Sequence, residues 1–252
     1  MLSPPQAIDP TDQNPALPSP KRALAWLLLF AVAFFLAAFV FFIGYGVYLS
    51  FNNSNLSAAE VDALMGSNGL SLNVIAAVYI TQFAVLVPLV IVASNFPEQH
   101  WSQTLALRPV AFKFMARWLG VWGVFQVLCV ILHQWVDIPV DDFIAQMAGS
   151  KNLLMSFVII FLAPVLEELV FRGYLFKAWR RSWLGFSGTL LLTSTLFVLL
   201  HVGQYHPLVL LQLFVLALML GVARERTGSV ITPWLIHTVN NTFAVIALVF
   251  WA

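Results

Sequence analysis

Long apolar segments separated by short polar ones run along most of this chain, and the pattern predicts a bundle of membrane-spanning helices. A helix needs about 20 mostly apolar residues to cross the ~30 Å hydrocarbon core of a bilayer. The segments that meet or approach this length are 23–50, 72–96, 114–136, 152–176, 187–201, 207–223 and 229–252. The expected fold class is therefore all-α, a polytopic transmembrane bundle of seven helices, or eight if one span is split or missed.

Composition strengthens this interpretation and narrows the partners. Of 252 residues, 61% are hydrophobic and only 9% charged, so lipid must be the main solvent. The net charge of +1 is spread over loops, which excludes the basic patch that nucleic acid would need. Residues 1–22 are rich in proline and lack an apolar run, so we expect a disordered tail before a single membrane domain at 23–252.

The loop charges predict a topology. Most Lys and Arg side chains fall before the first apolar segment or in alternate loops after it, and the opposite loops carry acids. By the positive-inside rule the N-terminus is expected in the cytoplasm, in a multi-pass protein of the cell membrane. The single cysteine, Cys129, is expected to be a small core residue, since it can form neither an internal disulfide nor a thiolate metal site.

Three charged residues lie well inside a predicted span: Glu167, Glu168 and Arg172. A charge at bilayer depth costs about 2.5 to 3.5 kcal/mol, so it is kept where it faces protein or water. Glu168 and Arg172 are four residues apart and can form an ion pair on one helix face. Glu167 is turned about 100° away and needs another partner. Because Pro164 also weakens the local backbone ladder, we expect a polar cavity at Glu167.

Histidine and asparagine supply further polar groups at a similar depth. His201 ends the segment FVLLH, and His237 and Asn241 lie four apart on one helix face, where Asn240 competes with Asn241. Helix rise places these groups about 15 to 21 Å along their helices, close to the level of Glu167. The other three histidines are expected to be interfacial: His100, His133 and His206.

Together these blocks resemble the signature of the CPBP family, which includes the type II CAAX prenyl endopeptidases and the Abi proteins. The family pattern EExxxR, FxxxH and HxxxN is present as Glu167 to Arg172, Phe197 to His201 and His237 to Asn241. All three motifs occur in order, each within an apolar segment. The resemblance covers about 112–252, which would be the catalytic core.

The resemblance implies an intramembrane endopeptidase, and we expect no cofactor. Glu167 and His201 would activate water, and His237 and Asn241 would form an oxyanion hole. The substrate would be a membrane-associated or lipidated peptide or protein, with prenylated CAAX proteins as the family example. Glu168, Arg172 and Phe197 would support these groups. Such chemistry is reasonable, because a desolvated carboxylate is a competent general base and aimed donors stabilise an oxyanion.

Other functions fit the same residues. A zinc protease could use Glu167, His201 and His237 as ligands with water in the fourth position. A non-enzymatic membrane protein, such as a bacteriocin-immunity or partner-binding factor, could hold the cluster as a structural polar core. A proton-coupled transporter would also place Glu and His at mid-membrane, although the chain shows no inverted repeat.

Overall fold

The computed structural model describes residues 18–52, 57, 59–60, 70–136 and 142–250, and these form helices with no strand. Within them, five helical rods are long and apolar enough to cross a membrane. They are α1 (Pro20–Asn52), α3 (Leu72–Ser94), α5 (Phe112–His133), the rod Leu153–Arg180 and α11 (Pro207–Thr227). The shorter α10 (Gly185–Leu199) and α12 (Ile231–Phe250) correspond to the remaining two predicted segments. The predicted all-α membrane bundle is confirmed.

The rod at the centre of the bundle is not a regular α-helix. It consists of α7 (Leu153–Phe157), the π-helix η1 (Val158–Leu162), α8 (Ala163–Glu168), the π-helix η2 (Leu169–Leu175) and α9 (Phe176–Arg180). π-Helical segments are rare and often occur at functional sites. Here they lie directly before and after the short α8, which ends at the two glutamates.

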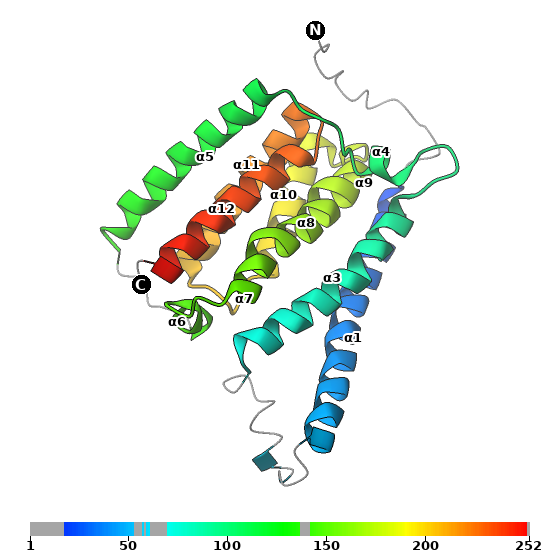
Figure 1. Ribbon diagram of the computed structural model, residues 1–252. Coiled ribbons are helices and arrows are strands. Elements are labelled where there is room, and N and C mark those ends of the chain that lie inside the picture. The colour runs from blue at the N-terminus through cyan, green and yellow to red at the C-terminus, as the bar shows by residue number, and fades with distance from the viewer. Residues whose placement is uncertain (1–17, 53–56, 58, 61–69, 137–141, 251–252) are drawn as a thin grey trace.

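The other helices surround this rod (Figure 1). α3 packs along it on one side, α12 contacts η1 and α8 on another, and α10 contacts η2 and α9. α1 packs mainly on α3, and α5 contacts α11 and α12 at the periphery. The short α6 (Asp142–Met147) lies against α12. The rod that carries the glutamates is therefore the most enclosed part of the bundle.

Large apolar side chains cover the outside of the bundle, as expected for a surface solvated by lipid. On α1, Phe35 is 70% exposed and Phe39 63% exposed. α5 has no buried residue among those the structure describes. Cys129 lies on this helix and is half-buried, so the prediction of a core cysteine is wrong.

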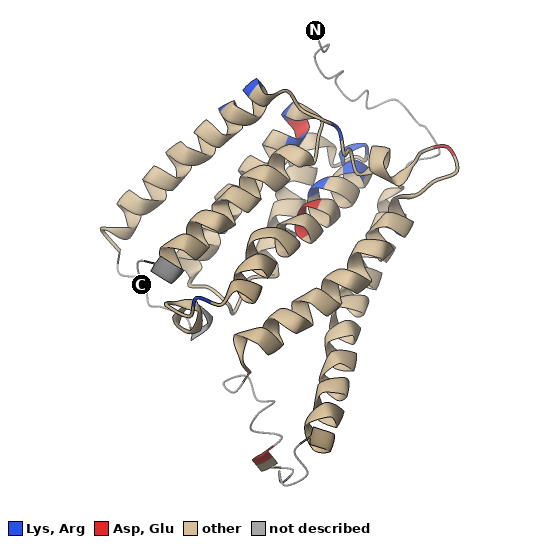
Figure 2. Ribbon diagram, viewed as in Figure 1, with Lys and Arg blue, Asp and Glu red and all other residues tan. Residues whose placement is uncertain are grey.

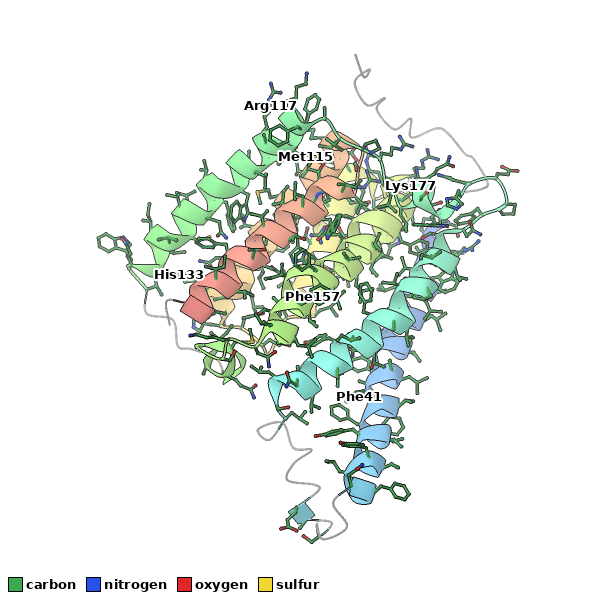
Figure 3. The ribbon with its side chains drawn as sticks, in the orientation of Figure 1. Phe41, Met115, Arg117, His133, Phe157 and Lys177 are labelled. Carbon is green, nitrogen blue, oxygen red and sulfur yellow. The ribbon has the colours of Figure 1, made fainter. Side chains whose placement is uncertain are left out.

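Basic side chains gather at one end of the bundle (Figure 2). Arg117 and Lys177 lie toward this end, and His133 lies toward the other (Figure 3). The basic end is formed by the alternate loops that the sequence analysis grouped together, and its cytoplasmic location stays a prediction. The predicted disordered tail lies mostly outside the described residues, and α1 begins at Pro20, within it.

Arg224 is a further buried charge, which the sequence analysis did not include. The predicted segment 207–223 placed it in a loop, but α11 continues to Thr227 and ends at Gly228, which has φ of 64°. Arg224 is only 3% exposed, and its Nε donates to the carbonyl of Arg172 at 2.9 Å. The sequence signal for the true end of this helix was Gly228, because glycine commonly follows the last residue of a helix.

The connection between α3 and α5 is packed into the bundle. It contains α4 (Trp101–Thr104), followed by the fully buried Leu105. Leu105 lies against Gly173 of η2, where an added Cβ would come within 2.9 Å of Leu105 Cδ2. The same connection accepts a hydrogen bond from the amide of Val230 at Ala106, which ties it to the start of α12.

Candidate active site

A buried ion pair forms the base of the site. Arg172 Nη1 donates to Glu168 Oε1 at 3.0 Å, and Nη2 donates to the carbonyl of Ala217 on α11 at 3.0 Å. Both side chains are almost completely buried, with Glu168 at 1% and Arg172 at 0% exposure. The i, i+4 pairing expected from the sequence is present, and it links the rod to α11.

Phe197 of α10 lies at the centre of a ring of aromatic and cationic groups. The Arg172 guanidinium lies 4.8 Å from its ring centroid, a cation–π contact shielded from solvent. The rings of His201 and His237 have centroids 4.9 and 5.8 Å away. Phe197 therefore packs both histidines against the ion pair, which gives a physical reason for a phenylalanine four residues before His201.

His237 of α12 lies between the two glutamates. Its Nδ1 is 2.9 Å from Glu168 Oε1, and its Nε2 is 3.6 Å from Glu167 Oε2. Because Glu168 also accepts from Arg172, its carboxylate fixes Nδ1 as the protonated nitrogen of His237. The Nε2 atom faces Glu167 at a distance too long for a strong hydrogen bond and short enough for an ion pair.

His201 lies just beyond α10, in the turn that follows the helix, and not within a spanning helix as the segment 187–201 implied. A helix of 15 residues extends about 22 Å, less than the ~30 Å hydrocarbon core, so α10 ends before crossing. His201 Nδ1 is 2.9 Å from the carbonyl of Phe197. A carbonyl can only accept, so Nδ1 carries a proton, and the neutral form of the ring then has its lone pair on Nε2.

Asn241 reaches across from α12 to the rod. Its Nδ2 donates to the carbonyl of Ile159 at 2.9 Å. Within η1 the Ala163 amide pairs five residues back with Val158, and the same register would pair residue 164 with Ile159. Pro164 has no N–H, so the Ile159 carbonyl lacks that partner. The carbonyl freed by this proline is thus satisfied by Asn241, whereas the sequence analysis took the proline as a sign of a cavity at Glu167.

Asn240 turns toward α5. Its Oδ1 accepts from Trp122 Nε1 at 3.1 Å and from Gln126 Nε2 at 3.0 Å, and its Nδ2 donates to Asn241 Oδ1 at 3.3 Å. The two asparagines therefore have different partners. Asn241 contacts the rod, and Asn240 contacts α5 and donates a hydrogen bond to Asn241. Sequence reasoning missed Trp122 and Gln126, although a glutamine within an apolar segment was a usable signal.

A cavity of about 470 Å³ opens beside Glu167, between α1, α3, the rod and α10. Its lining includes Glu167 and His201, and most of the remaining wall is apolar, with Phe34, Leu86 and Leu166 among its residues. The sequence analysis expected a polar cavity at Glu167. The structure has a cavity there, but its wall is mainly apolar. An acid and an imidazole thus share an apolar cavity large enough for several side chains.

The remaining histidines have local roles. His100 accepts from the amide of Ser102 and caps α4, and His206 accepts from the amide of Leu208 and caps α11. His133 pairs with Gln212. Over the described ranges, no three His, Cys, Asp or Glu side chains are grouped closely enough to hold a metal ion.

Comparisons with known proteins match the segment that carries this site to one protein family. Residues 149–243 match the family model described as type II CAAX prenyl endopeptidase Rce1-like. This segment is Rce1-like. The family resemblance inferred from the three motifs is confirmed, since the match contains all of them.

One curated relative is similar to part of the chain. It is an uncharacterized 24.3 kDa protein of Escherichia coli, 32% identical over 139 residues, which cover 51% of this chain and 62% of the relative. The match therefore spans less than two thirds of the relative's length. No solved structure matches the chain. The Rce1-like segment holds the rod, α10, α11 and most of α12, whereas α1, α3 and α5 lie outside it.

Proposed function

We propose that this protein is an intramembrane endopeptidase of the CAAX type, which hydrolyses a peptide bond of a membrane-associated or lipidated substrate. One observation carries the proposal: Glu167 and His201 line the same apolar cavity, while the carboxylate of Glu167 lies 3.6 Å from His237. The match of the surrounding segment to prenyl endopeptidases supports the choice of reaction.

Glu167 and His201 activate the attacking water in this proposal. Glu167 is the carboxylate that does not pair with Arg172, and the neutral ring of His201 has its lone pair on Nε2 because Nδ1 carries the proton. A water held between them gives up one proton as its oxygen attacks the carbonyl carbon. The same groups return that proton to the departing amine, so the enzyme ends in its starting state.

His237 and Asn241 stabilise the oxyanion. Asn241 Nδ2 has two protons, and the Ile159 carbonyl takes one of them. For His237 Nε2 to donate while Nδ1 donates to Glu168, both ring nitrogens must be protonated. Donors fixed in an apolar site are worth about 3 to 4 kcal/mol each in related chemistry, because they need no reorganisation during the reaction. Glu168 and Arg172 act as positioning residues that orient the His237 ring.

The test uses the purified full chain and an internally quenched peptide with a farnesylated CAAX-type C-terminus. We expect Glu167→Gln to lower kcat by about 10²- to 10⁴-fold, since it keeps the size of the side chain and removes the base. Glu225→Gln is the matched control, because Glu225 forms a peripheral ion pair with Arg180 at 2.9 Å and should leave cleavage unchanged. Equal cleavage by wild type and Glu167→Gln would overturn the assignment.

Two further measurements address the alternatives. Activity that survives a strong chelator would eliminate a zinc enzyme, and the steps above use no metal. In cells, the processing of membrane proteins and peptides should differ between wild type and Glu167→Gln. A variant that keeps full cellular function without any change in processing would favour a non-enzymatic immunity or partner-binding protein.

A further inference from the structure

His201 lies in the turn between α10 and α11, beyond Leu199, the last residue of α10. The amide of Gln204 donates to the carbonyl of His201 at 3.1 Å and closes this turn. Gly203 within the turn has φ of 85°, a left-handed conformation that glycine adopts without strain. The turn therefore reverses the chain directly after His201, and it determines where the side chain of Tyr205 lies.

Tyr205 stacks on the imidazole of His201. The two ring centroids are 6.0 Å apart, and the ring planes are inclined by 24°. This separation falls within the range of about 4.5 to 7 Å that aromatic pairs favour. The next residue, His206, caps α11 and accepts from the amide of Leu208. The backbone of Tyr205 is therefore held between a closed turn and the start of a helix.

A second aromatic ring contacts the same imidazole. The ring centroid of Phe197 is 4.9 Å from that of His201, and Phe197 precedes the histidine by four residues as Tyr205 follows it by four. The hydrogen bond between His201 Nδ1 and the Phe197 carbonyl, at 2.9 Å, fixes one atom of the imidazole. Because a single hydrogen bond does not fix the plane of a ring, the two aromatic neighbours are needed to hold it.

We propose that Tyr205 is a positioning residue for His201, and that its ring holds the imidazole in the orientation needed to activate water beside Glu167. The inference rests on the proposed endopeptidase function and deepens it, since Tyr205 belongs to none of the three motifs. Tyr205 is not among the residues that line the cavity, so it acts through His201 and does not touch the substrate. Misplacement of a water-activating group lowers the rate of the chemical step. Tyr205 should therefore affect kcat and not KM.

Steady-state cleavage of the farnesylated quenched peptide tests this role. We expect Tyr205→Leu to lower kcat by about three- to tenfold with KM unchanged, the loss that one aromatic contact corresponds to. Tyr205→Phe keeps the ring and should restore kcat to within about twofold of wild type. A kcat as low with phenylalanine as with leucine would show that the ring is not the feature that matters.

Tyr48→Leu is the matched control. Tyr48 stacks on Tyr45 of α1 with ring centroids 6.3 Å apart and planes inclined by 16°, so the same substitution removes a contact of similar geometry. Neither of these tyrosines lines the cavity. Tyr48→Leu should therefore cleave the peptide as wild type does, and an equal loss of kcat in Tyr48→Leu and Tyr205→Leu would overturn the inference.

A second background separates positioning from a loss of folded protein. In His201→Gln the imidazole is absent, so Tyr205→Leu should have no further effect on the residual cleavage, measured over long incubations. If Tyr205 only stabilises the fold, the substitution lowers cleavage by the same factor in both backgrounds, and the inference is wrong.

The results also distinguish this inference from the function on which it rests. An unchanged kcat in Tyr205→Leu, with cleavage that still depends on Glu167, overturns only the positioning role. No cleavage by wild type, or cleavage that is indifferent to Glu167→Gln, overturns the proposed function together with it.

Discussion

Removing Arg172 should destabilise the protein far more than removing a peripheral arginine. Arg172→Met keeps much of the side-chain volume but leaves Glu168, which is 1% exposed, without its guanidinium. Breaking a buried ion pair by removing one partner costs about 3 to 5 kcal/mol. We expect the lower end of this range, about 3 kcal/mol, because His237 Nδ1 still contacts Glu168 at 2.9 Å.

Arg180→Met is the matched comparison. Arg180 also pairs with a glutamate, at 2.9 Å, but the two side chains are 18% and 19% exposed. Water can replace the lost partner there, so the cost should be at most about 1 kcal/mol. The assay is unfolding of the purified protein in mixed micelles, followed by circular dichroism, from which the free energy of unfolding of each variant is obtained.

A double variant isolates the origin of the effect. Glu168→Gln combined with Arg172→Met removes both buried charges, and we expect it to be more stable than Arg172→Met alone. Equal free energies of unfolding for Arg172→Met and Arg180→Met would refute the argument from burial. A double variant as unstable as the sum of its single changes would show that lost packing, and not an unpaired charge, explains the cost.

Further predictions concern the asparagines of α12. Pro164→Ala supplies an N–H that can donate to the Ile159 carbonyl in place of Asn241, so we expect about a tenfold lower kcat with little change in stability. Steady-state kinetics would check this, and an unchanged kcat would show that Asn241 does not depend on Ile159. Asn240→Leu leaves two donors on α5 without their acceptor, and should lower the free energy of unfolding by about 1 to 3 kcal/mol. An unfolding measurement within error of wild type would contradict the structural role of Asn240.

Local spacing predicted the local parts of this site. Glu168 and Arg172 lie four apart on one helix, so their pairing follows from helix geometry alone. Helix bounds were less accessible, because hydropathy ended the predicted segments at 201 and 223, whereas α10 ends at Leu199 and α11 continues to Thr227. The sequence offered two histidines as partners of Glu167, and the structure places it against His237, seventy residues away on α12. Equal depth indicated that such a contact was possible, but it could not specify which groups would meet.

The choice between Asn240 and Asn241 shows a limit of periodicity. Both residues satisfy helical spacing from His237, and neighbouring elements decide between them. Asn240 is drawn to α5 by two side-chain donors, and Asn241 to the rod by the carbonyl of Ile159. That carbonyl is available because the π register of η1 meets Pro164, and a hydropathy pattern contains no information about hydrogen-bond register.

Departures from regular helix bring the water-activating groups to the cavity. α8 lies between two π-helical segments, and it carries Glu167 next to a glutamate that faces Arg172. α10 ends short of a full span, so His201 sits in a turn at the cavity. Backbone that is not helical is tolerated at membrane depth only where it is enclosed by protein or lines a cavity. An α10 that continued past Leu199 would keep residue 201 in helical backbone, so the position of His201 in the turn depends on the early end of α10.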